Sequence, residues 1–116
     1  MFDFDRITGF YERALDGLAQ RQNVIGHNIA NQSTPGYHAR RVDFEAALKQ
    51  AEVDGRGFEH VTVSTREDQG APRSDGNNVN LEFEWMQLEK TRLLHSLLTR
   101  SLGGRFSAMV QAIRSQ

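Results

Sequence analysis

Histidine and carboxylate side chains are the groups in this chain that could bind a metal. Histidine occurs four times, at positions 27, 38, 60 and 95, and a site built from His27, His38 and Asp43 can be imagined. Metal sites need several ligands that converge with hydrogen-bonded support, and their sequences show compact spacings such as two histidines on successive helical turns. No such spacing is present here, so we expect no bound metal.

The usual sequence contexts of enzyme active sites are missing as well. No Gly-x-Ser-x-Gly elbow is present that would expose a serine nucleophile. Glu82 and Glu84 are two residues apart on an expected helix, so their carboxylates point in different directions and cannot share a proton. Gly55 and Gly57 form an isolated Gly-x-Gly without the rest of a dinucleotide fingerprint. We therefore expect no enzymatic activity and no cofactor.

Size and charge narrow the class of protein further. The 116 residues make at most one ordinary domain, and the absence of cysteine excludes disulfides and thiolate chemistry. The net charge of -1 argues against a nucleic-acid partner, because neutralising phosphates requires a basic face. No stretch approaches the roughly 18 apolar residues that cross a bilayer. The first residues lack the basic and apolar regions of a cleaved signal peptide, so export would have to use another signal.

The most informative segment covers residues 28–37, and its residue types bend the chain without offering any reactive group. Asn31 and the polar residues after it compete for backbone hydrogen bonds and should end a helix. Pro35 pushes Thr34 out of the α region, and Gly36 can supply the positive φ of a type II turn with proline at its second position. We predict a sharp turn that redirects the chain here.

An amphipathic helix is expected to lead into this turn over residues 8–31. Thr8 could cap its start, with Asp5 near the positive end of the helix dipole. Apolar or aromatic residues recur at three- and four-residue steps. They are Tyr11, Leu15, Leu18, Ile25 and Ile29.

A second amphipathic helix is expected over residues 81–114, capped by either Asn78 or Asn80. One apolar stripe holds Phe83, Met86, Leu93 and Leu97, and it drifts to Leu94, Leu98, Leu102, Phe106, Met109 and Ile113. Gly103-Gly104 interrupts this helix. The pair predicts either a kink or helix end, or a close approach by a neighbouring helix.

The middle of the chain shows weaker patterns. Residues 43–50 could form a brief helix capped by Asp43, although Val42, Asp43 and Phe44 could equally be extended. Residues 58–65 alternate apolar and polar types, which indicates a short strand, and residues 66–80 read as a loop.

The expected fold is therefore mainly α. Long N- and C-terminal amphipathic helices pair as a coiled-coil-like layer, with a small irregular or weakly β segment between them. The expected division is 1–36 for the N-terminal helix and turn, 37–80 for the middle segment and 81–116 for the C-terminal helix. Because the apolar residues gather in the two terminal segments, we expect a core divided between the ends and burial completed by association of subunits.

Two stretches of this chain resemble the flagellar rod and hook axial proteins, and the proximal-rod family in particular. The first runs from Arg21 through Asn28-Ile29-Ala30-Asn31 and Thr34-Pro35-Gly36-Tyr37 to Asp43-Phe44. The second begins at Asp75-Gly76-Asn77-Asn78-Val79 and leads into a helix that ends in the run from Phe106 to Ile113.

The resemblance implies a structural subunit of the proximal rod of the flagellar basal body, which serves motility by coupling the membrane ring to the drive shaft. It implies export through the flagellar type III apparatus without a cleaved signal, and a place in the periplasmic rod. The implied partners are copies of the chain, other rod proteins, the rod–ring junction protein FliE and the ring protein FliF. An autonomous coiled-coil adaptor is the alternative, and it should be folded and helical at low concentration.

Two sets of residues are expected to serve assembly. The turn set contains Asn28, Asn31, Thr34, Pro35, Gly36, Tyr37, Asp43 and Phe44. The helix-packing set contains Leu15, Leu18, Ile25, Ile29, Phe83, Met86, Leu93, Leu97, Leu102, Phe106, Met109 and Ile113.

Overall fold

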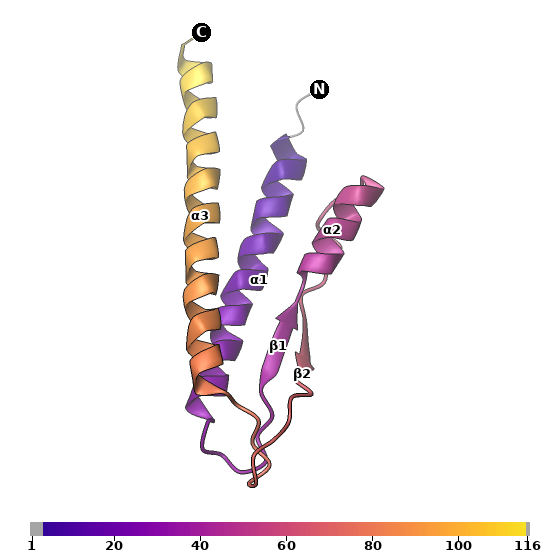
Figure 1. Ribbon diagram of the computed structural model, residues 1–116. Coiled ribbons are helices and arrows are strands. Elements are labelled where there is room, and N and C mark those ends of the chain that lie inside the picture. The colour runs from indigo at the N-terminus through magenta and orange to yellow at the C-terminus, as the bar shows by residue number, and fades with distance from the viewer. Residues whose placement is uncertain (1–3, 116) are drawn as a thin grey trace.

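The computed structural model describes residues 4–115 as an elongated, mainly helical body, with principal extents of 67 × 27 × 14 Å. The elements in chain order are α1 (Phe4–Ala30), β1 (Arg40–Asp43), α2 (Glu45–Asp54), β2 (Ser64–Glu67) and α3 (Leu81–Arg114). Figure 1 shows α1 in the middle, with α3 running antiparallel along one side and the β1–α2–β2 segment on the other. The expected fold class is confirmed, and residues 1–3 and 116 of the expected terminal segments lie outside the described residues.

Both long helices form where the apolar periodicity predicts them. The helix end considered at Gly103-Gly104 is wrong, because α3 runs as one helix from Leu81 to Arg114. The starts of the two helices differ in how they are capped. α1 begins at Phe4, so Thr8 lies one turn inside the helix and cannot cap it, which corrects the expected start. Asp5 does lie in the first turn, where its charge favours the helix dipole. At α3 the Asn80 side chain accepts a hydrogen bond from the Phe83 amide at 3.1 Å, so Asn80 and not Asn78 is the cap.

The middle segment contains both of the alternatives that the sequence left open. Val42 and Asp43 are extended in β1, and α2 starts immediately afterwards at Glu45. Asp43 does not cap α2, because its carboxylate accepts a hydrogen bond from Arg66 of β2 at 2.7 Å. β1 and β2 pair antiparallel with Val42 opposite Thr65.

The strand expected over 58–65 is wrong in position, since β2 covers Ser64–Glu67. Phe58 and Val61 are buried, but they lie in the irregular segment before the strand. Each of them packs into the core, and neither is paired with a residue of a neighbouring strand. Their apolar alternation therefore reflects burial in a loop and not the period of a strand.

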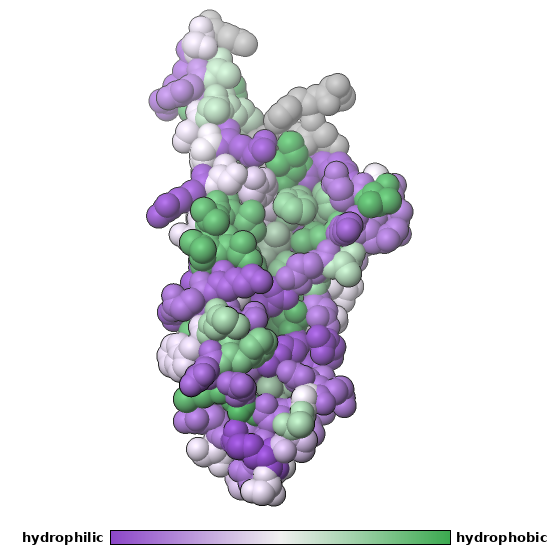
Figure 2. All heavy atoms as spheres, viewed as in Figure 1, coloured by the Kyte–Doolittle hydropathy of each residue, from purple (hydrophilic) through white to green (hydrophobic). Residues whose placement is uncertain are grey.

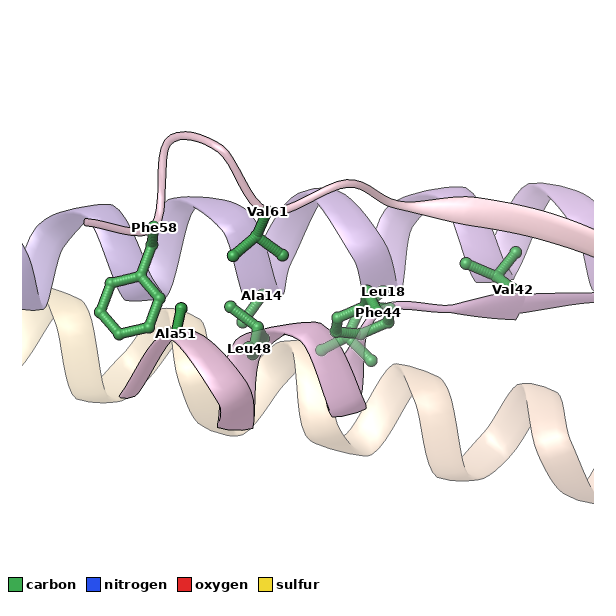
Figure 3. Close-up of a cluster of buried hydrophobic side chains, with 8 residues drawn as sticks. All are labelled: Ala14, Leu18, Val42, Phe44, Leu48, Ala51, Phe58 and Val61. Carbon is green, nitrogen blue, oxygen red and sulfur yellow. The ribbon is translucent and has the colours of Figure 1, made fainter. Parts of the chain in front are cut away.

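The hydrophobic core lies between α1 and the middle segment, not between the two terminal helices. Figure 3 shows its members gathered from α1, β1, α2 and the loop before β2. They are Ala14, Leu18, Val42, Phe44, Leu48, Ala51, Phe58 and Val61. This corrects the expectation of a core divided between the chain ends, because burial of the middle segment against α1 supplies most of it.

The contact between α1 and α3 is partly polar. The most buried residues of α3 are Glu84, Leu88 and Thr91, which recur at helical spacing on the side that meets α1. Farther toward the N-terminus of α1 and the C-terminus of α3, the Tyr11 and Ser101 hydroxyls share a hydrogen bond of 2.7 Å. Hydrogen bonding as well as apolar packing therefore holds the two helices together.

Candidate functional site

The turn after α1 has the geometry that its sequence predicts. The amide of Tyr37 donates to the Thr34 carbonyl at 3.2 Å, and Gly36 has a φ of 76°. With Pro35 at the second position this is a type II turn, in which a side chain at the third position would be strained. Asn31 closes the end of α1, because its side-chain amide donates to the His27 carbonyl and its oxygen accepts from the Thr34 hydroxyl.

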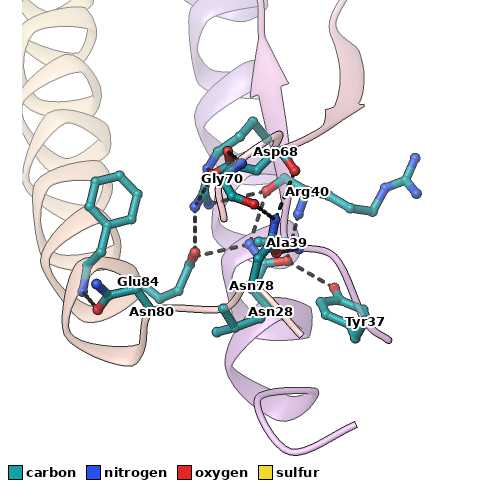
Figure 4. Close-up of polar contacts among 12 residues, drawn as sticks. Asn28, Tyr37, Ala39, Arg40, Asp68, Gly70, Asn78, Asn80 and Glu84 are labelled. Carbon is teal, nitrogen blue, oxygen red and sulfur yellow. Dashed lines mark hydrogen bonds and ion pairs between the residues drawn. The ribbon is translucent and has the colours of Figure 1, made fainter. Parts of the chain in front are cut away.

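Asn28 ties the turn to α1 and to the strand that follows it. The side chain is fully buried, and its oxygen accepts from the Tyr37 hydroxyl at 2.9 Å and the Arg40 amide at 3.0 Å. Its nitrogen donates to the Arg40 carbonyl and to the Glu84 carboxylate. Figure 4 shows Asn28 at the centre of these contacts. Every hydrogen-bonding position of a buried amide is thus used, which a smaller or apolar side chain could not reproduce.

The segment before α3 closes onto the turn from the other side. Asn77 is fully buried, and its side-chain nitrogen donates to the carbonyls of Asn31 and Thr34, each at 2.8 Å. The amide of Gly36 donates to the Asp75 carbonyl at 2.8 Å. A Cβ on Gly76 would lie 3.2 Å from the Gly36 Cα, so the two backbones touch. We call residues 28–37 together with 75–80 the clasp, since each half supplies the other's hydrogen-bond partners.

A buried ion pair anchors the clasp to the base of α3. Glu84 is fully buried and lies 2.7 Å from the Arg41 guanidinium, which also pairs with Asp68 at 3.0 Å. Burial alone would lower the pKa of Arg41, but the bonds and charges of Glu84 and Asp68 outweigh it and raise that pKa. Burial raises the pKa of the Tyr37 hydroxyl, so it remains a neutral donor to Asn28.

Sequence reasoning missed Arg41 and Glu84. Two adjacent arginines such as Arg40 and Arg41 are ordinary on a protein surface, and Glu84 lies in the first turn of α3, where a carboxylate is common. Arg40 is indeed exposed, whereas Arg41 is half-buried in the pair with Glu84. No local pattern marks the pair, because its partners come from β1 and α3, more than 40 positions apart in the sequence.

Most of the expected turn set meets in the clasp. Asn28, Asn31, Thr34, Gly36 and Tyr37 all contribute hydrogen bonds there, and Pro35 is exposed at the tip of the turn. Asp43 and Phe44 lie elsewhere. Asp43 pairs with Arg66 in the two-stranded sheet, and Phe44 is a core residue against α1.

The helix-packing set falls into three groups. Leu18 and Ile25 are buried within the chain. Leu15, Ile29, Phe83, Leu102 and Met109 are half-buried. The exposed group consists of Met86 at 59%, Leu93 at 61%, Leu97 at 51%, Phe106 at 44% and Ile113 at 65% relative exposure. Figure 2 shows apolar side chains at the surface along the α3 side of the molecule, separated by hydrophilic ones. Met86, Leu93 and Leu97 of this exposed group lie on the side of α3 opposite the buried Glu84, so the described chain leaves this outer side uncovered.

The rest of the surface of residues 4–115 has few groups arranged to bind a ligand or a metal. A groove of about 510 Å³ between β1 and α3 is lined partly by arginines, but Arg21, Arg41 and Arg66 already pair with acidic side chains there. Within residues 4–115, no group of three or more His, Asp or Glu side chains could hold a metal. No helix of that range is long and apolar enough to cross a membrane.

The chain is similar to flagellar basal body rod proteins. A family model described as "Flagella basal body rod protein" matches residues 10–38, which contain most of α1 and the turn. The flagellar basal body rod protein FlgB of Escherichia coli K12 is 32% identical, and the match covers 96% of this chain and 95% of that protein. The FlgB proteins of Yersinia enterocolitica and Salmonella typhimurium are each 30% identical over 95% of this chain, covering 97% and 94% of their own lengths.

Proposed function

Since the chain belongs to the FlgB family of flagellar basal body rod proteins and is a structural, non-enzymatic subunit of the rod, we propose that it occupies the proximal end of the rod. There it would join the membrane ring to the drive shaft. The proposal draws on the two-part sequence match, in which the Asp43-Phe44 continuation after the turn resembles the proximal member.

The observation that carries the proposal is the uncovered outer side of α3. Three large apolar side chains on this side are each at least half exposed, namely Met86, Leu93 and Leu97. Full burial of such a side chain contributes about 1.5–3 kcal/mol of favourable free energy. Large apolar side chains that gather on one exposed side of a helix favour contact with another protein. A subunit that is packed among others in a rod would cover these side chains, which the isolated chain leaves in water.

The three parts of the chain would then have separate mechanical roles. Residues 1–36 and 81–116 would form the axial layer of helices, and residues 37–80 would pack outward against adjacent subunits and set their stagger. The clasp supports this division, because it holds the ends of α1 and α3 and the start of the outward segment in one hydrogen-bonded unit. Axial load on either helix would therefore reach the outward segment.

The partners that we propose are copies of the chain, the other rod proteins, the junction protein FliE and the ring protein FliF. Export would run through the flagellar type III apparatus without a cleaved signal, and the assembled chain would lie in the periplasmic space. These assignments rest on the family membership and on the resemblance of the two sequence stretches.

Mass spectrometry of detergent-purified hook–basal bodies tests the proposal, with salt-washed membranes as the reference. We expect the chain to be enriched together with the other rod proteins. A Leu97→Asp variant should be lost from these particles, because it places a charge among the uncovered apolar side chains. The matched control is Ser96→Asp, an exposed neighbour on another side of α3 that should assemble normally. Absence of the wild-type chain from particles that hold the other rod proteins would refute the proximal assignment.

A further inference from the structure

The outer side of α3 is marked by residues seven positions apart. Met86, Leu93 and Arg100 lie on one face, because seven residues make nearly two helical turns. This face points away from α1, since Met86 and Leu93 each follow by two positions the buried Glu84 and Thr91, which is about 200° around a helix. It therefore presents two large apolar side chains and then a cation.

The exposed side of α1 shows a reciprocal pattern at the same spacing. Glu12, Ala19 and Gly26 are all exposed and are also seven positions apart. Each follows directly after a residue of α1 that is buried within the same chain, and these buried residues are Tyr11, Leu18 and Ile25. This face presents an anion and then two residues with little or no side chain.

No contact within residues 4–115 explains why position 26 of α1 is a glycine. It lies inside α1, where glycine is about 1 kcal/mol less favourable than alanine. A Cβ built on it would meet nothing within 4 Å. By contrast, a Cβ on Gly17 of the same helix would come within 2.5 Å of the Phe44 ring, so Gly17 is required by the core. A neighbouring molecule that packs closely against α1 at position 26 would account for this glycine in the same way.

We propose that the outer face of α3 in one copy docks on the exposed face of α1 in the next copy, in antiparallel orientation. The equal spacing then places Met86 over Gly26, Leu93 over Ala19 and Arg100 beside Glu12 at one and the same register. The large side chains meet the small ones, and the cation meets the anion. Arg100 and Glu12 form no ion pair within residues 4–115, so each is available to the other copy.

This contact joins two different surfaces, so it does not close on itself. A head-to-tail contact between identical chains repeats into a ring or a helical row, whereas a contact of one surface with itself stops at a dimer. All copies in such a row point the same way, which makes α3 of one antiparallel to α1 of the next, as the two helices are within a single chain (Figure 1). The inference rests on the proposed function in that copies of the chain must lie side by side.

Cysteine cross-linking in isolated hook–basal bodies tests the contact, because the natural chain has no cysteine. A variant with both Ala19→Cys and Leu93→Cys should give a ladder of covalent dimers, trimers and larger species on mild oxidation. Either single substitution should stay monomeric, and so should Ala19→Cys with Ser96→Cys. A dimer from Leu93→Cys alone, or a cross-link of this chain to another rod protein in place of the ladder, would overturn the proposal.

Charge reversal provides a second test that does not depend on cross-linking. Glu12→Arg and Arg100→Glu should each reduce the amount of chain in the particles, and the double variant should restore it. Arg92→Glu, an exposed cation on a different side of α3, is the control and should have no effect. Particles that contain the wild-type chain but show neither ladder nor rescue would refute this surface and leave the rod assignment intact. Particles without the chain would refute the rod assignment itself.

Discussion

The two long helices of this protein differ in how much of their surface the chain itself covers. α1 is packed by α3 on one side and by β1, α2 and the loop before β2 on the other, so its apolar residues are mostly buried. α3 meets only α1 over much of its length and leaves Met86, Leu93 and Leu97 in water. Both helices carry apolar residues at three- and four-residue steps in the sequence, although the stripe of α3 drifts around the helix. The comparison shows that periodicity identifies an interaction face without identifying whether its partner belongs to the same chain.

The clasp adds a second contrast, between polar and apolar ways of fixing the chain. The core holds the middle segment to α1 through side-chain burial, which is tolerant of small shifts. The clasp holds the helix ends through buried amides and an ion pair, whose geometry is directional. Its register is therefore set by specific partners, and this suits a point at which two helices and a turn must keep one relative position.

The largest expected effect comes from a side chain that packs on the covered side of α1, in comparison with one on the uncovered side of α3. Phe44→Ala should lower the free energy of unfolding by about 3–5 kcal/mol, because Phe44 is 4% exposed and its loss leaves a cavity. Leu97→Ala should change it by less than about 0.5 kcal/mol, since that side chain is half exposed. Urea denaturation of the dilute monomer measures both. Equal losses would mean that α3 is covered within the chain after all.

The buried ion pair should come next. Glu84→Ala leaves Arg41 with Asp68 alone and removes an acceptor of Asn28, so we expect a loss of about 3 kcal/mol in the free energy of unfolding. Glu82→Ala, an exposed carboxylate in the same helical turn, is the control and should cost under about 1 kcal/mol. Thermal unfolding followed by circular dichroism gives both values. If the two variants unfold alike, the clasp does not depend on the pair.

Two glycines of α1 should respond in opposite directions. Gly17→Ala forces a methyl group into the Phe44 ring and should destabilise the monomer by about 1–3 kcal/mol. Gly26→Ala meets open space and should stabilise the monomer by up to about 1 kcal/mol. The same Gly26→Ala change should nevertheless reduce incorporation into basal bodies, because it fills the place proposed for Met86 of the next copy. A monomer destabilised by Gly26→Ala would show that an internal contact requires this glycine.

The smallest expected effect is a pH dependence at the start of α2. The hydrogen bonds from Arg21 lower the pKa of Glu45 below its usual value of 4.5. The folded pKa thus lies below the unfolded one, so the stabilisation is present above about pH 4.5 and is lost as the pH falls through the folded pKa. The difference in melting temperature between wild type and Glu45→Gln should therefore shrink from pH 7 to pH 3. A difference that stays constant over this range would exclude the charge of Glu45 as its cause. The effect is modest because the Glu45 side chain is 60% exposed.

The amino-acid sequence was enough to predict the two long helices and the type II turn, and it limited the cap of α3 to Asn78 or Asn80, of which the structure uses Asn80. Each depends on local chemistry: apolar residues at helical spacing, a proline followed by a glycine, and an asparagine before the first helical turn. The start of α2 and the position of β2 were harder to predict from the sequence. For β2 the reason is that Phe58 and Val61 follow the alternation of a strand but are buried singly in a loop.

The position of the core and the identity of the buried polar residues could not be predicted from local sequence and depend on the tertiary structure. Glu84 and Arg41 have ordinary surface surroundings in the sequence, and they become partners because the fold brings the first turn of α3 close to the start of β1. The structure likewise decided that Leu18 faces inward while Leu93 does not, although both belong to apolar stripes at helical spacing. The physical reason is that periodicity is a property of one helix, whereas burial is a property of the surface that meets it.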